Sequence, residues 1–97
     1  MIRASTTKDG TKVVLEGNVG VDEVAALQKA LDDAKAEGGV DVELTSCQSL
    51  SSSAIGALIA CHNVLVPKGM RLRVRGANED LRRLLELMGL DRHFELV

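Results

Sequence analysis

Two short segments of the chain alternate strictly between apolar and charged residues, and a long apolar segment lies between them. Residues 40–44 read Val-Asp-Val-Glu-Leu, and residues 70–75 read Met-Arg-Leu-Arg-Val-Arg. Such alternation is typical of a strand with one buried face and one solvated face. Residues 52–66 are nearly all apolar or small and precede Pro67, which predicts a buried helix. A strand-helix-strand unit of this length predicts parallel neighbours joined by a right-handed crossover.

The N-terminal part of the chain predicts a hairpin followed by a helix. Residues 2–6 and 11–16 read as two strands joined at Asp9-Gly10, where glycine supplies the positive φ of a tight turn. Apolar residues at helical spacing then predict a helix over about residues 21–37. We expect Gly38-Gly39 to end this helix.

The C-terminal part predicts one more helix and a short strand. Asn78 is a good N-cap for a helix that Gly89 ends, and residues 94–97 are expected to add a terminal strand. The expected apolar stripe of this helix consists of Leu81, Leu84, Leu85 and Met88. Together the segments predict an α/β fold, with a mixed sheet of four or five strands and helices packed mainly on one face.

Length and composition favour one small globular domain over residues 1–97. The net charge is -2 and the single aromatic residue is Phe94, which argues against nucleic acid as a partner. No apolar run is long enough to insert into a membrane and the first residues do not resemble a signal peptide, so we expect a cytoplasmic protein. Cys47 and Cys61 are expected to be unlinked thiols.

The alternating strands place charges of both signs on the uncovered side of the predicted sheet. Arg71, Arg73 and Arg75 share one face of their strand. If the two strands are neighbours, Asp41 and Glu43 lie beside these arginines on the solvent-facing side. Cross-strand pairs of opposite charge are an ordinary way to solvate such a face, so we do not interpret the arginines as an anion site.

The sequence gives little support to an enzymatic function. It contains none of the glycine-rich phosphate loops and no Gly-x-Ser-x-Gly nucleophile motif. His62 lies within the predicted apolar helix, where we expect a partly buried ring bonded to backbone or water, and His93 reads as a surface residue. Neither histidine has further ligands at metal-site spacing. We therefore expect no catalytic residue, no metal and no cofactor.

Three consecutive serines, Ser51, Ser52 and Ser53, stand at the predicted start of the apolar helix. One of them can cap the helix through its side-chain oxygen. A phosphate on a serine at this position is also well tolerated, because free backbone N–H groups and the helix dipole favour negative charge there. The residues alone leave both interpretations open.

Three motifs of the chain resemble those of a known family. Glu43-Leu44-Thr45 resembles a strand followed by Asp-Leu-Ser, residues 51–55 resemble Asp-Ser-Ser-Gly-Leu, and Gly89-Leu90 followed by Phe94 resembles a late Gly-Leu and Phe. In order and spacing these motifs resemble the STAS domain of bacterial anti-sigma factor antagonists over essentially the whole chain. The resemblance implies phosphorylation of Ser52 by a serine kinase that is itself an anti-sigma factor, and removal of the phosphate by a phosphatase.

The resemblance also implies a protein-binding surface, formed by Ser51, Ser53, Asn18 and Gly20. The chain departs from the family pattern at this surface. Ser51 and Ala54 replace the family's Asp and Gly, and residues 17–20 read Gly-Asn-Val-Gly where the family has Gly-x-Leu-Asp. An alternative therefore stays open: an accessory subunit of an ABC-type phospholipid transporter or another signalling complex, docking an ATPase without phosphorylation.

Overall fold

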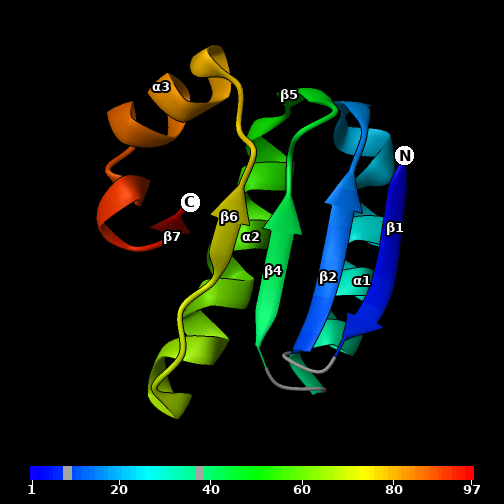
Figure 1. Cartoon of the computed structure of the whole chain (residues 1–97). Helices are drawn as coiled ribbons and strands as arrows, with labels where there is room; N and C mark the ends of the chain where they lie inside the picture. Colours follow the sequence, from blue (N-terminus) through cyan, green and yellow to red (C-terminus); the bar gives the residue numbers. More distant parts are fainter. Residues whose placement is uncertain (8–9, 37–38) are drawn as a thin grey trace.

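The computed structural model describes residues 1–7, 10–36 and 39–97, and within them most strands belong to one mixed sheet (Figure 1). The described strands of this sheet follow the order β1-β2-β4-β6-β7. They are β1 (Ile2–Thr7), β2 (Gly10–Leu15), β4 (Val40–Glu43), β6 (Arg73–Arg75) and β7 (Glu95–Leu96). β1 runs antiparallel to β2, and every other neighbouring pair is parallel. This arrangement confirms the predicted mixed sheet and its crossovers.

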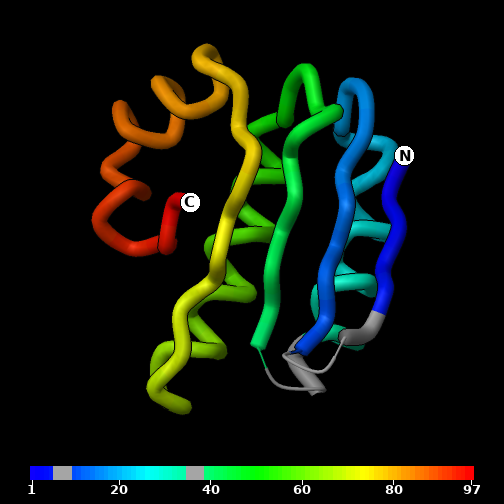
Figure 2. Tube along the Cα trace, viewed as in Figure 1, coloured from blue at the N-terminus to red at the C-terminus, as the bar shows by residue number. Residues whose placement is uncertain are grey.

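Helices α1 (Val24–Ala36) and α2 (Ser52–Leu65) lie side by side on one face of the sheet, whereas α3 (Glu79–Leu87) lies beyond β6, on the side of the edge strand β7 (Figures 1 and 2). Short 3-10 turns precede or follow these helices. They are η1 (Val21–Glu23), η2 (Val66–Lys68) and η3 (Leu90–Arg92). The helix predicted over residues 21–37 therefore begins with a 3-10 turn, and the one predicted over residues 52–66 passes into η2, which contains Pro67.

The hydrophobic core lies between the sheet and the two helices on its covered face. Alternate residues of β2 and β4 are buried and face this layer, while the residues between them are only partly buried. Large side chains of the core with at most 2% exposure include Val13, Leu15, Leu27, Leu31, Val42, Leu58, Leu65 and Phe94. Burial of this apolar surface is the main source of stability in a domain of this size. Cys47 and Cys61 are buried in the same core and form no disulfide, as predicted.

The uncovered face of the sheet carries ion pairs between neighbouring strands. The pairs are Arg3–Glu16 at 3.1 Å, Lys12–Glu43 at 2.9 Å, Arg75–Asp41 at 3.0 Å and Arg73–Glu95 at 3.7 Å. The strand register places opposite charges side by side, because Arg73 lies between Asp41 and Glu95. Arg73 pairs with Glu95 directly across from it, whereas Asp41 pairs diagonally with Arg75. The predicted solvated face with paired charges is confirmed, and we call it the open face.

The prediction for Arg71 is wrong. The strand expected over residues 70–75 begins only at Arg73, and Arg71 does not join the arginine stripe. Its guanidinium instead donates to backbone carbonyls near the C-terminus, and Asp41 pairs with Arg75. The physical reason lies at Leu72, whose amide donates to the His62 side chain instead of entering a strand ladder.

The last helix is correct in its boundaries and partly wrong in its buried face. Asn78 caps α3, its side-chain oxygen accepting from the Leu81 amide at 2.8 Å. Leu81 and Leu85 are buried as predicted, but Leu84 and Met88 are 37% and 46% exposed. They are exposed because α3 packs against the edge of the domain and is covered on one side only (Figure 1).

Two predicted features fall partly outside the described residues: the turn at Asp9-Gly10 and the helix end at Gly38-Gly39. Asp9 and Gly38 are not among the described residues, so only Gly10 and Gly39 can be compared with the prediction. Gly10 has a φ of +132°, and a Cβ there would lie 2.3 Å from the Gly39 carbonyl oxygen. Glycine at position 10 is therefore required by both its backbone conformation and its close neighbour.

Candidate partner-binding site

A small second sheet brings the predicted site residues together. β3 (Gly17–Val19) pairs in parallel with β5 (Cys47–Leu50), beyond the ends of β2 and β4 (Figure 2). The Ser49 hydroxyl donates to Asn18 Oδ1 at 2.7 Å, and the Ser51 amide donates to the Val19 carbonyl at 2.9 Å. Residues 17–20 and the serine segment, about 30 positions apart in sequence, therefore lie side by side.

Ser51 is the N-cap of α2. Its backbone is extended, with φ -69° and ψ 161°, and its Oγ accepts from the Ala54 amide at 3.1 Å. The Ser51 carbonyl accepts from the Ile55 amide at 3.0 Å, which closes the first turn. The prediction that one serine caps the helix is confirmed, and the structure identifies it as Ser51.

Ser52 and Ser53 are the first two residues of α2, and both are exposed. Ala54 and Ile55, which follow them, are buried in the core. One turn later Gly56 is exposed, and a Cβ added there would meet nothing within 4 Å. The first two turns of α2 therefore present hydroxyls and open space to solvent, at the end of the helix whose free N–H groups attract negative charge.

The 3-10 turn η1 extends this surface from the other side. It packs against α2, and its Val21 side chain is 71% exposed. The Gly20 carbonyl accepts from the Glu23 amide at 3.1 Å, which anchors the turn directly after β3. We call Asn18, Gly20, Val21 and Ser51–Ser53 the docking surface.

Sequence reasoning missed two features of the docking surface. It did not predict the β3–β5 pair, because these short segments are rich in Gly, Asn and Ser and lack clear alternation. It also assigned Val21 to the first turn of the helix expected over residues 21–37, whereas Val21 lies in the 3-10 turn that precedes that helix. The signal that could have identified Val21 is its place directly after Gly20, ahead of the periodic apolar residues.

The histidines lie far from the serines. His62 is ten residues further along α2 than Ser52, which corresponds to about 15 Å of helix. Its ring contacts His93 and Phe94 near the C-terminus. Neither imidazole can act as a base toward a serine hydroxyl from this position. The serines are therefore suited to contact a partner, or to be modified by another enzyme.

In the described part of the chain, no three His, Cys, Asp or Glu side chains gather in an arrangement that could hold a metal ion. No described helix has the length and apolar character needed to cross a bilayer.

The fold matches solved structures of anti-sigma factor antagonists. SpoIIAA in its unphosphorylated form aligns with 100% of this chain and 87% of its own, at 12% identity and a TM-score of 0.82. The phosphorylated form of Bacillus SpoIIAA aligns with 100% and 91%, at 14% identity and a TM-score of 0.79. An anti-sigma factor antagonist from Mycobacterium paratuberculosis aligns with 99% and 83%, at 23% identity and a TM-score of 0.79. At these identities the matches show a shared fold.

Sequence comparison assigns the family. No curated protein matches the sequence significantly. The family model described as "Mlab, STAS domain" matches residues 2–97, which is nearly the whole chain. The architecture, the capped helix α2 and this match agree with one another, and the chain belongs to the STAS domain family.

Proposed function

We propose that the chain is an anti-sigma factor antagonist that binds a serine-kinase anti-sigma factor and is switched by phosphorylation of Ser52. The observation that carries this proposal is that one serine caps the helix while the next one is exposed. Ser51 caps α2, which leaves the exposed Ser52 hydroxyl without a structural duty. The same fold occurs in SpoIIAA, whose structures include an unphosphorylated and a phosphorylated form.

The position of Ser52 lets a phosphate act on binding without damage to the fold. A phosphate adds about 1.5 to 2 negative charges at neutral pH. At the first residue of α2 these charges are stabilised by free N–H groups and by the helix dipole. In a desolvated contact with a partner they would meet a large penalty unless a cation receives them. Phosphorylation is therefore expected to release the partner and leave the domain folded.

The docking surface is suited to a protein partner. Its exposed Val21 offers apolar contact, and its serines and Asn18 offer hydrogen bonds. We propose that the kinase and the phosphatase both engage this surface. The chain acts in this proposal as a binding protein and the kinase supplies the chemistry, in agreement with the distance of His62 from the serines.

The test begins with a partner captured from lysate of the source bacterium and identified by mass spectrometry. If it is a serine kinase, the purified kinase with ATP is expected to modify Ser52, and Ser52→Ala is expected to abolish the modification. Ser52→Ala should bind as the wild type does. Ser52→Asp should weaken binding by more than tenfold, which corresponds to more than about 1.4 kcal/mol. Thermal melts of both variants are expected to match the wild type.

Ser53→Ala and Ser53→Asp are the matched controls, one residue further along the same turn. They should keep the Ser52 modification, and Ser53→Asp should cost less affinity than Ser52→Asp. Equal affinity of wild type, Ser52→Ala and Ser52→Asp would eliminate the switch. Phosphorylation of Ser51 or Ser53 in place of Ser52 would support the phosphorylation switch but assign it to a different serine.

A second function is favoured by two observations. An uncharged Ser51 stands where antagonists resembling this chain have Asp, and the matching family model is described as Mlab, STAS domain. Under this alternative the docking surface holds the ATPase of an ABC-type phospholipid transporter in a lasting complex. Capture of such an ATPase, with equal affinity for wild type and Ser52→Asp, would favour it over the antagonist.

A further inference from the structure

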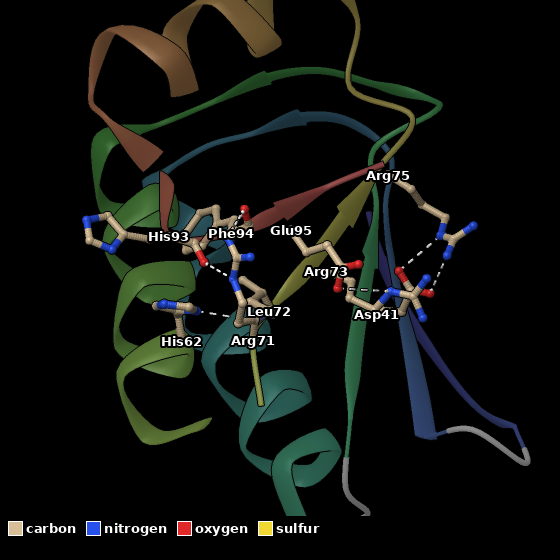
Figure 3. A network of polar contacts seen from close by, with 9 residues as sticks. All are labelled: Asp41, His62, Arg71, Leu72, Arg73, Arg75, His93, Phe94 and Glu95. Carbon is tan, nitrogen blue, oxygen red and sulfur yellow. Dashed lines mark hydrogen bonds and ion pairs between the residues drawn. The ribbon is translucent and has the colours of Figure 1, made fainter. Parts of the chain in front are cut away.

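His62 is a titratable side chain buried in the last turn of α2, with 6% of its surface exposed. Its ring lies edge-on to Phe94, with centroids 5.4 Å apart, and to His93 at 6.1 Å. Its Nδ1 atom accepts a hydrogen bond from the Leu72 amide at 3.3 Å (Figure 3). Because Nδ1 is an acceptor here, the ring is neutral and carries its proton on Nε2.

Leu72 connects this ring to the last residues of the chain. Its amide donates to His62, and its carbonyl accepts from the Glu95 amide at 2.8 Å. The Val97 amide donates to the Val74 carbonyl at 2.9 Å, which extends the same short ladder. We call residues 90–97 the C-terminal segment. Leu72 therefore takes part both in the backbone ladder that holds this segment on β6 and in the hydrogen bond to His62.

Arg71 holds the C-terminal segment at the same place. Its guanidinium donates to three successive backbone carbonyls, and Figure 3 shows those of His93 and Phe94. The three carbonyls are those of Arg92 at 3.3 Å, His93 at 2.8 Å and Phe94 at 2.9 Å. Phe94 itself is 1% exposed and lies against the His62 ring. The segment is therefore fixed by one cation, one buried ring and a short backbone ladder.

The charges around His62 oppose its protonation. Burial of the ring lowers the pKa of His62 below its usual value, and the nearby charges of His93 and Arg71 lower it further. Of the acidic residues in the C-terminal segment, Glu95 pairs with Arg73 on the open face, and Asp91 is exposed on η3. A proton on His62 would therefore lie beside two groups, His93 and Arg71, whose positive charges oppose it.

We propose that His62 is a proton-sensitive latch that keeps the C-terminal segment docked while its ring is neutral and releases it when the ring is protonated. A proton taken from solvent onto Nδ1 turns the acceptor into a donor that faces the Leu72 N–H. The hydrogen bond is then lost, and a positive charge appears beside Arg71 and the Phe94 ring. The free-energy cost of this buried charge falls when Leu72 and the C-terminal segment move away from α2, because the protonated ring then reaches water.

The direction of the pH dependence follows from linkage. The released state binds the proton more tightly than the docked state, since the docked ring is buried and faces cations. Docking is therefore complete above the ordinary imidazole pKa of about 6.5 and weakens as the pH falls below it. For each unit by which docking lowers the pKa of His62, the ratio of released to docked molecules rises by up to about tenfold at low pH.

The test is amide hydrogen exchange of the full chain by NMR, corrected for intrinsic rates, at about pH 7.5 and 5.5, on either side of the ordinary imidazole pKa. The Leu72, Glu95 and Val97 amides of the wild type are expected to lose protection at the lower pH. The backbone amides of β2 and β4 provide the internal reference and should keep theirs. His62→Asn places Oδ1 where Nδ1 stood and does not titrate, so its C-terminal segment is expected to stay protected at both values.

His93→Asn is the matched control, since it removes the other imidazole of the cluster and should leave the pH response in place. Equal protection of the segment at both pH values would overturn the latch, as would an unchanged response in His62→Asn or its loss in His93→Asn. If the amides of β2 and β4 lose protection at the lower pH together with the segment, the domain unfolds as a whole, and this would also overturn the latch. If His62→Asn does not fold, titration of the wild-type His62 ring decides: a pKa at or above 6.5 contradicts the proposal.

Discussion

The two parts of helix α2 differ in how their polar side chains are used. At its first turn, Ser52 and Ser53 are exposed, and only the cap residue Ser51 bonds to the helix. Ten residues later, His62 is buried and is bonded to a backbone amide outside the helix. A rigid element thus has one part that is free to meet a partner and another that holds the domain together. We expect substitutions at the first part to change binding and substitutions around the second to change stability.

The largest effect is expected for a substitution next to the buried part of α2, around His62. Phe94→Ala removes a side chain that is 1% exposed and packs against the His62 ring, so we expect a loss of about 3–5 kcal/mol in the free energy of unfolding. Denaturant unfolding measures it. Val97→Ala, at a side chain 55% exposed in the same segment, is the control and should cost far less. A loss below about 1 kcal/mol for Phe94→Ala would mean that the segment contributes little to the fold.

A smaller effect is expected at the cap. Ser51→Ala removes the oxygen that accepts from the Ala54 amide and should lower the free energy of unfolding by about 1 kcal/mol. Ser52→Ala removes a hydroxyl at the next position, where the side chain is exposed, and is the matched control with no expected change. Thermal unfolding of both variants compares them directly. Equal destabilisation by the two substitutions would contradict the assignment of Ser51 as the cap.

The smallest expected effect has the opposite sign. Gly56 is exposed inside α2, and a Cβ added there would meet nothing within 4 Å. Gly56→Ala should therefore raise the free energy of unfolding by about 0.5 to 1 kcal/mol, since alanine loses less backbone freedom in a helix. Gly76→Ala is the contrasting variant: Gly76 has a φ of +75°, and its Cβ would lie 2.3 Å from Thr45 Oγ1, so it should destabilise. A Gly56→Ala protein less stable than the wild type would show that this face of α2 is not free.

The regular part of this fold could be predicted from the sequence, because its signals are local. Strict alternation identified β4, and the run of apolar and small residues before Pro67 identified α2. Asn78 was recognised as a cap by its own chemistry and by the apolar stripe after it. Each of these features depends on residues within one or two turns of one another.

The parts that sequence reasoning missed depend on contacts between distant segments. β3 and β5 are short and polar, and their pairing is visible only when the ends of β2 and β4 are placed side by side. Arg71 looked like the first member of an arginine stripe, but its partners lie more than twenty positions away in the C-terminal segment. Leu84 and Met88 have the spacing of core residues, yet the edge position of α3 leaves them exposed. In each case the deciding partner is not a neighbour in sequence.

The open face has a consequence for how the molecule behaves at high concentration. A domain with helices on only one side of its sheet leaves the other side available to a second sheet, and an apolar surface there would favour aggregation. The four ion pairs place alternating positive and negative groups across this surface, each still partly hydrated. Stacking two such faces would require water to be removed from many charges at once. Exposed ion pairs of this kind contribute little to folding, and we expect their larger effect to be on association, where they disfavour face-to-face contact between two copies of the domain.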